Sequence, residues 1–248
     1  MTFENRILKK AEATSNVFSF NDICKILGLD FIKSTACAID DSIKSNAKEI
    51  LVHYSQCSDI LLFIQSAISR SCYDLKYSLH PPYTTSKLDC EYVMKKLIKA
   101  GLIDDFYYSS LSNSYRIIIN SSSNYNLKQI LCIGLSSLLE ETPASDILLD
   151  SCFKSKDGKF IYADVACRFH NKILIFCFQI STGLEKDVTS HSEQLQKLIN
   201  KVLQSYFIES SNIHVFFIVT PHCKEILSSY NRVVSVDDII KIIDEFKA

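Results

Sequence analysis

Glycine and proline are scarce in this sequence of 248 residues, which has only 5 Gly, 4 Pro and no Trp. Phosphate-binding loops depend on closely spaced glycines, which let backbone N–H groups approach a phosphate. Neither the GxxxxGK(S/T) pattern of P-loop proteins nor the GxGxxG pattern of dinucleotide-binding proteins occurs. The sequence therefore excludes nucleotide hydrolysis by a P-loop.

An excess of charge of one sign is also missing. The 27 Lys and Arg residues are balanced by 28 Asp and Glu residues, which gives a formal net charge of -1. Many nucleic-acid-binding proteins use a global basic excess for non-specific attraction to phosphates. A nucleic-acid site in this chain must therefore be a local patch.

Metal-binding and export signals are absent as well. The 10 cysteines include no CxxC pair and the histidines have no ligand spacing, which argues against zinc fingers. Residues 1–13 are charged and lack the apolar core of a signal peptide, and the longest apolar runs have the length of a strand. We expect an intracellular protein, in the cytoplasm or nucleus, that is not secreted, has no membrane partner and keeps its thiols reduced.

A polar stretch at Ser121–Asn124 predicts a division of the chain, because it separates a strand-like from a helix-like segment. Three parts are expected: residues 1–56, helical with a first helix-turn-helix; residues 57–121, a second such unit; and residues 125–248. In the first part, a short helix ends at Gly28, and an amphipathic helix is expected over Ile32–Val52.

The second part has a clearer pattern. Helical apolar faces occur over Ile60–Ile68 and Thr84–Gly101, and two aromatic, β-branched strands follow at Leu102–Tyr108 and Tyr115–Asn120. The string VMKKLIKAGLIDDFYYSSLSNSYRIII resembles the end of a winged helix, with a third helix, a glycine stop and a two-stranded wing. This resemblance covers about sixty residues, from Ser58 to Asn120.

The winged-helix resemblance implies DNA as a partner. In such domains the third helix enters the major groove with its leading end and contacts phosphates along its length. The corresponding residues are Thr84, Thr85, Ser86 and Lys87 at the leading end, and Lys95, Lys96 and Lys99 near phosphates. The acidic residues Asp89, Glu91, Asp104 and Asp105 weaken the local field, which leaves open a winged helix used only for protein contact.

The third part predicts an α/β domain. The expected elements are helix 127–141, strands 147–153, 159–169 and 172–181, helix 190–206, strand 213–220, helix 222–229, strand 232–235 and helix 236–246. A tight turn is expected at His170–Asn171. Two segments, Ile173–Phe178 and Val215–Val219, are continuously apolar, as in central strands covered on both faces.

The order α-β-β-β-α-β and the string ADVACRFHNKILIFCFQIS resemble the restriction-endonuclease-like, or PD-(D/E)xK, nuclease fold over about 120 residues. In that family, an acid near the end of one strand and an acid in the next bind Mg²⁺, and a lysine two places later positions the attacking water. Here Asp164 matches the first acid, Gln179 takes the place of the second, and Ser181 stands where the lysine is expected.

This signature is incomplete. A glutamine in the second position resembles the Mrr-type branch, whose motif is QxK, but a serine cannot supply the lysine's charge. Catalysis would need a lysine from elsewhere, for which Lys186 or Lys172 are near in sequence. If the site is active, the expected metal ligands are Asp164, Gln179, Glu140 and Glu141, and His191, Glu193 and Gln194 open the helix that follows at the same edge.

The sequence leaves three classes of function open. The first, which we favour, is a DNA-binding protein whose nuclease-like domain is catalytically degenerate, has no cofactor and serves binding or assembly. The second is a divergent endonuclease that uses Mg²⁺ or Mn²⁺, with Asp164, Gln179 and Lys186 as its catalytic residues. The third is a protein-interaction adaptor. Because a duplex has two-fold symmetry, a homodimer or a protein-complex partner is compatible with each reading.

Overall fold

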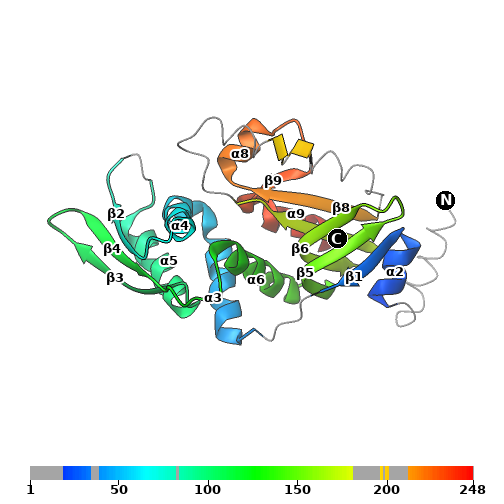
Figure 1. Ribbon diagram of the computed structural model, residues 1–248, viewed down its shortest axis with the longest axis horizontal. Coiled ribbons are helices and arrows are strands. Elements are labelled where there is room, and N and C mark those ends of the chain that lie inside the picture. The colour runs from blue at the N-terminus through cyan, green and yellow to red at the C-terminus, as the bar shows by residue number, and fades with distance from the viewer. Residues whose placement is uncertain are drawn as a thin grey trace. The chain divides into compact units, whose positions relative to one another are not determined.

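The computed structural model describes residues 19–34, 39–81, 84–180, 196–197, 199–200 and 212–247. These residues form two compact units, and Figure 1 shows the elements of both. The first unit contains 19–34, 138–179 and the described residues from 196 onwards, and the second contains 39–81, 84–137 and residue 180. Both units thus draw on separated stretches of sequence, and the ranges 1–56, 57–121 and 125–248 stay predictions about domains.

The first unit is built on a sheet of six strands in the order β1-β5-β6-β7-β8-β9. The four strands from β1 to β7 pair antiparallel, whereas β7, β8 and β9 pair parallel. Their bounds are β1 Leu29–Lys33, β5 Ser145–Ser155, β6 Phe160–Phe169, β7 Lys172–Phe178, β8 Ile213–Val219 and β9 Val233–Ser235. The strands expected in this half of the chain are confirmed, and the mixed sheet is compatible with an α/β nuclease-like fold.

The centre of this sheet is buried on both faces. Every residue of β7 after Lys172 is buried, which explains its continuously apolar sequence. The hairpin from β6 to β7 turns at His170, whose φ of 52° lies in the left-handed region. The predicted turn at His170–Asn171 is therefore confirmed.

Helices of the first unit cover one face of this sheet. In α2 (Phe20–Ile26), the Phe20 ring lies 6.2 Å from Phe153 of β5, and in α9 (Ile239–Lys247) the Phe246 ring lies 6.4 Å from Phe169 of β6. The ladder registers place Phe153 and Phe169 on the same side of the sheet. The short helices α8 (Pro221–Ile226) and η2 (Val236–Asp238) flank β9, and most of the helix expected over 190–206 lies outside the described residues.

The helix predicted over Ile32–Val52 is wrong in its first part. Residues Leu29–Lys33 form β1, which pairs with β5, and the helix α3 covers only Asp41–Val52. The partner strand is more than a hundred residues away, so the sequence near β1 carries little sign of its pairing. The predicted stop at Gly28 is confirmed, since its φ of 85° is a conformation that glycine adopts without strain.

The second unit combines helices with a three-stranded antiparallel sheet in the order β2-β4-β3. Its elements are α3, α4 (Tyr54–Ser69), β2 (Asp74–Ser78), α5 (Lys87–Lys99), β3 (Ile103–Ser109), β4 (Ser114–Ile119) and α6 (Leu127–Glu140), of which residues up to 137 belong here. The helices expected over 60–68 and 84–101 and the two strands after them are confirmed. The strand β2 was not expected.

Local chemistry fixes the limits of α5. Ser86 caps its start by accepting a hydrogen bond from the backbone N–H of Asp89 at 3.2 Å. Gly101 follows its end with a φ of 75°, as predicted. Tyr77 and Tyr115 are buried beneath the helices and connect the sheet to the apolar interior of the unit. No helix in the described part of the chain is long and apolar enough to cross a membrane.

Candidate functional site

The acidic residue expected from the nuclease resemblance lies where two central strands separate. The ladder between β6 and β7 ends with the pair Val165 and Phe176. Beyond it, the carboxylate of Asp164 accepts a hydrogen bond from the backbone N–H of Phe178 at 2.6 Å. The half-buried side chain thus replaces the ladder partner that this N–H lacks.

Gln179 shares this edge of the sheet. Its backbone N–H donates to the carbonyl of Ile218 at 2.7 Å, so β7 stays paired with β8 after it has separated from β6. Because residues alternate along a strand, the register of Ala166 with Ile175 puts Asp164 and Gln179 on the same face. Both residues therefore lie on one face of the sheet, near the point where β6 and β7 separate, and their joint role as a site stays a prediction.

Lys172, one of the two lysines named as possible replacements, lies far from this edge of the sheet. Lys172 begins β7, seven residues before Gln179, and at the rise of an extended strand this separates them by roughly 23 Å. Its ammonium lies over the ring of Phe246, 5.0 Å from the centroid, at the other end of the strand. Ser181, Lys186, His191, Glu193 and Gln194 lie outside the described residues.

The described side chains alone do not fit Mg²⁺ or Mn²⁺. Within the part of the chain that the structure describes, no three His, Cys, Asp or Glu side chains gather as a metal site. Glu140 and Glu141 are exposed at the end of α6. A hard divalent cation prefers six oxygen ligands, and one oxygen of Asp164 is engaged by Phe178. A metal ion would thus depend on groups beyond the described ones.

The leading end of α5 is largely engaged within the protein. Thr84 donates its hydroxyl and backbone N–H to the carboxylate of Asp59, at 2.5 and 2.6 Å. Thr85 is buried, and Ser86 caps the helix. Thr84 and Ser86 therefore have structural partners that a nucleic acid would have to replace, and Thr85 is not accessible to it.

Lys87 is also engaged on the surface of its own unit. Its ammonium lies 3.8 Å from the centroid of the Tyr108 ring and 3.9 Å from the Glu91 carboxylate. A carboxylate this close to a cation cancels much of the field that the cation exerts on other groups. Lys87 is therefore a weaker phosphate ligand than the sequence implies.

Two lysines further along α5 are different. Lys95 and Lys99 are exposed, lie four residues apart on one side of the helix, and have no carboxylate within ion-pair distance among the described residues. Lys96 is half-buried, with its ammonium 5.2 Å from the centroid of the Tyr92 ring. Of the predicted phosphate contacts, Lys95 and Lys99 are the ones best placed to meet a polyanion.

The sequence did not predict a cluster of three partly buried side chains between α3 and α5: Glu49, His53 and Tyr92. Tyr92 donates a short hydrogen bond to the carboxylate of Glu49 on α3, and the His53 ring lies 4.8 Å from the Tyr92 ring. The hydrogen bond from Tyr92 holds the pKa of Glu49 below its usual range, while burial and this same contact raise the pKa of Tyr92 to about 12. Glu49 and Tyr92 are 43 residues apart in the sequence, so no local sequence pattern indicates that they are in contact.

Comparison with known proteins identifies the fold rather than the protein. No known family and no curated protein matches the sequence. Among solved structures, protein VC1899 from Vibrio cholerae superposes with a TM-score of 0.53 at 13% identity, covering 93% of this chain and 60% of that one. Can2 from Sulfobacillus thermosulfidooxidans, solved in complex with cyclic tetra-adenylate, superposes with a TM-score of 0.50 at 14% identity, covering 92% of this chain and 60% of that one.

These similarities extend over both compact units but not over the whole of the other proteins. The chain spans about 60% of the length of each. At such low identity the similarity shows the fold alone. The class defined by fold and comparison is a mixed α/β protein compatible with a nuclease-like fold.

Proposed function

We propose that this chain is a DNA-binding protein in which a winged-helix unit makes the contact and a catalytically degenerate restriction-endonuclease-like unit serves binding or assembly. The observation that carries the proposal is the order of the small sheet. In a winged helix, the strand before the third helix pairs with the last strand of the wing, and here β2 precedes α5 and pairs with β4.

The exposed lysines of α5 supply the local charge that this proposal needs. Because the chain as a whole has a net charge of -1, attraction to phosphates must come from a patch. Lys95 and Lys99 form such a patch on the helix that winged-helix proteins place against the duplex. Each phosphate contact releases counterions, so the affinity should fall steeply with salt.

Degeneracy of the nuclease-like unit is supported by its residues. Gln179 replaces an acid, Ser181 replaces a lysine, and the carboxylate of Asp164 holds a backbone N–H. A serine has no charge with which to steer an attacking hydroxide. This edge of the sheet therefore lacks parts of the chemistry that the family's site needs, which supports the proposal of a degenerate unit.

A second candidate, a divergent endonuclease that requires Mg²⁺ or Mn²⁺, is favoured by one observation. Asp164 and Gln179 share one face where β6 and β7 separate, which is the arrangement that the family's two metal ligands have. In this case Lys186 would be the catalytic cation, and Glu140 and Glu141 additional acids. The functional test must therefore include metal and a readout of cleavage.

The test measures the affinity of the full chain for a fluorescein-labelled duplex by anisotropy across a range of salt, with and without Mg²⁺ or Mn²⁺, followed by a denaturing gel. Lys95→Glu and Lys99→Glu should each weaken binding, and neutralising one phosphate contact should reduce the salt slope by about 1. Lys25→Glu changes an exposed lysine on α2 in the same way, so it is the matched control and should leave binding unchanged.

The outcomes separate the three classes. Salt-sensitive binding without cleavage, retained in Asp164→Ala, supports the DNA-binding proposal. Cleavage that requires metal and disappears in Asp164→Ala supports the endonuclease instead. If the duplex neither binds nor is cut, a protein-interaction adaptor becomes the working hypothesis and the proposal is wrong.

A further inference from the structure

The solvent face of the β2-β4-β3 sheet carries an aligned row of cations and an aromatic ring. Lys76 on β2 is opposite Arg116 on β4, and Arg116 is opposite Tyr107 on β3. Residues that are opposite one another in a ladder point to the same face, about 4.8 Å apart from strand to strand. The row therefore crosses all three strands of the sheet.

This face is open, unlike the other face of the same sheet. Leu75, Ile117 and Tyr115 are buried against the interior of the unit. On the open face, Tyr107 is 57% exposed although it is a large aromatic residue, and Lys76 and Arg116 are exposed. The Tyr107 ring thus lies in water beside the Arg116 guanidinium, at one end of a row that Lys76 ends on the other side.

A groove of about 420 Å³ follows this row towards the tip of the β3-β4 hairpin. Its walls include the two cations, the Tyr107 ring, and the Ser109 and Ser112 side chains. Small-molecule sites generally have volumes of about 300–1,000 Å³. The groove therefore has room for a unit the size of a nucleotide.

The flat groups of the face are held in place before any ligand arrives. Asp74 accepts hydrogen bonds from the Arg116 guanidinium at 2.6 and 2.9 Å, which fixes its plane. The hydroxyl of Tyr107 donates to Asp105 at 2.5 Å, which restrains the ring. Groups that are already ordered lose little conformational entropy when they bind.

We propose that this face, defined by Lys76, Arg116 and Tyr107, binds single-stranded nucleic acid, with an unpaired base stacked on Tyr107 and Arg116 and a phosphate against Lys76. Stacking on an aromatic ring next to cations is the general means by which proteins hold single strands, because every base has a π face. The inference rests on the proposed function and adds an unpaired strand to its ligands.

The net charge of this face differs from that of the proposed duplex contact, so the two sites should respond differently to salt. Asp74 and Asp105 balance Lys76 and Arg116, so the sum over the face is zero, and stacking rather than charge must supply most of the affinity. Single-strand binding should therefore depend weakly on salt, whereas duplex binding through Lys95 and Lys99 should depend on it strongly.

The experiment uses the full chain with fluorescein-labelled dT12 and rU12 and measures dissociation constants by anisotropy. Tyr107→Ala should weaken binding roughly 5- to 150-fold, the effect of removing one base-stacking ring. Tyr107→Phe should retain most of the affinity because it keeps the ring. Tyr162→Ala, which removes a tyrosine of β6 that is 70% exposed, is the control and should have no effect.

A covalent readout tests the position of the base directly. Oligonucleotides that carry 5-bromouracil are irradiated with the protein, and the crosslinked peptide is identified by mass spectrometry. The expected peptide contains Tyr107, and the crosslink should disappear in Tyr107→Ala. Because the side chain is exposed, this variant should melt at the same temperature as the wild type, which excludes loss of the fold as the cause.

Several results would overturn the inference. The proposal is wrong if neither oligonucleotide binds, if Tyr107→Ala binds them as tightly as the wild type, or if the crosslink maps to another part of the chain. A protein partner that occupied this face would give the first result. Lys95→Glu tests the duplex contact separately. If that variant loses duplex binding, the proposed function remains supported, whether or not the sheet face binds single strands.

Discussion

The carboxylate of Asp164 on β6 holds the backbone N–H of Phe178 on β7 at 2.6 Å, where the ladder between the two strands has ended. The residue that best matches a catalytic acid is therefore also a structural partner of the central strand. A catalytic carboxylate can usually be removed without loss of stability, whereas a partner of a buried N–H cannot. The two roles make different predictions for the same substitution.

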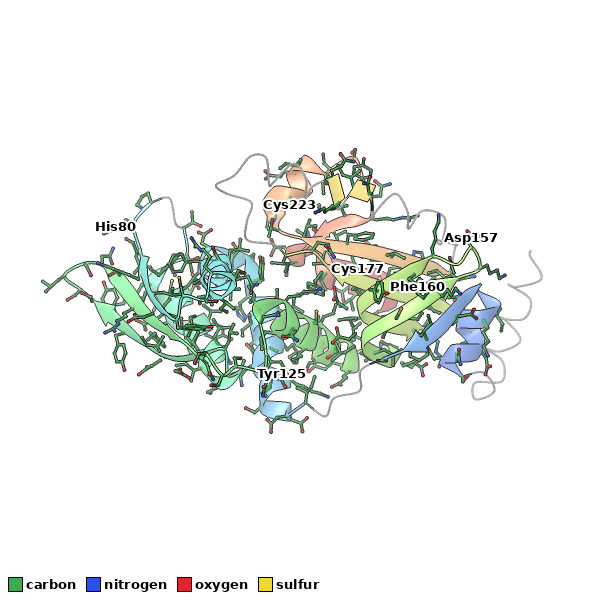
Figure 2. The ribbon with its side chains drawn as sticks, viewed as in Figure 1. His80, Tyr125, Asp157, Phe160, Cys177 and Cys223 are labelled. Atoms are coloured by element: carbon green, nitrogen blue, oxygen red, sulfur yellow. The ribbon has the colours of Figure 1, made fainter. Side chains whose placement is uncertain are left out.

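Asp164→Ala should lower the free energy of unfolding by about 1–3 kcal/mol, because it leaves the N–H of Phe178 without an acceptor. Asp164→Asn should be less destabilising, since an amide oxygen can still accept the bond. Urea unfolding followed by circular dichroism measures both. Asp157→Ala, in the exposed turn between β5 and β6 (Figure 2), is the control, with an expected change within about 0.5 kcal/mol. If Asp164→Ala is as stable as the wild type, Asp164 has no structural role.

The close approach of α6 to α3 predicts an unusual response to alanine. A Cβ added to Gly134 would collide with the backbone carbonyl of Ala47, whose carbon would lie 2.8 Å away. Alanine in a helix is normally more stable than glycine by roughly 0.5–1 kcal/mol. Here overpacking against a rigid backbone should reverse the sign and make Gly134→Ala less stable by about 1–3 kcal/mol.

Thermal unfolding measures this effect. Ser137→Ala, one turn further along α6, adds no atom and should change the melting temperature little. If Gly134→Ala instead melts above the wild type, the helices do not pack as closely as their backbones indicate.

Much of the fold follows from local patterns. The strands β6, β7 and β8 were predictable because their apolar runs are bounded by polar turns, and α5 because Ser86 and Gly101 mark its ends. The strand β1 was not, since its partner β5 lies more than a hundred residues away. The alternation of polar residues with Leu75 and Tyr77 in Asp74–Ser78 is a local signal for β2 that the sequence reasoning overlooked.

The candidate site was predictable only in part. Strand order and residue spacing determine which residues share a face, so the sequence could indicate that Asp164 and Gln179 lie on the same one, while their joint role as a site stays a prediction. The sequence did not indicate that the carboxylate replaces a ladder bond, which depends on where β6 and β7 separate. Likewise, the polar types of Thr84 and Ser86 suggested surface contacts, but their partners Asp59 and Asp89 are fixed by tertiary and capping geometry.

The hydrogen bond from Tyr92 to Glu49 predicts a pH-dependent contribution to stability. The pKa of Glu49 is lowered in the folded protein, so the contribution is present above its unfolded value of about 4.5 and is lost as the pH falls through the folded pKa. The wild type should therefore be more stable than Tyr92→Phe at pH 6, and the difference should shrink below pH 4.5.

Urea unfolding at a series of pH values tests this prediction. His53, Lys48 and Lys96 also act on Glu49 and remain in the Tyr92→Phe variant, so the comparison isolates the hydrogen bond. Glu49→Gln, which cannot titrate, should show a flatter stability profile on the acid side. A difference between wild type and Tyr92→Phe that is constant from pH 6 to pH 3 would contradict the assignment.

Thiol accessibility gives a prediction that covers both compact units. Of the nine cysteines in the described residues, Cys72 is exposed and the other eight are buried. Burial raises the pKa of Cys24, Cys90 and Cys167 to about 12, which leaves almost no reactive thiolate at neutral pH. The native protein should therefore react rapidly with 5,5′-dithiobis(2-nitrobenzoate) at Cys72, and the buried thiols should react only after unfolding.

Absorbance at neutral pH follows the reaction, and mass spectrometry identifies the labelled peptides. Cys37 lies outside the described residues, so the informative comparison is between Cys37→Ser and the double variant Cys37→Ser/Cys72→Ser. The single variant should retain one fast thiol and the double variant none, and both should release the buried thiols together in denaturant. Fast labelling of Cys167, in the buried strand β6, would mean that the sheet opens far more readily than its packing implies.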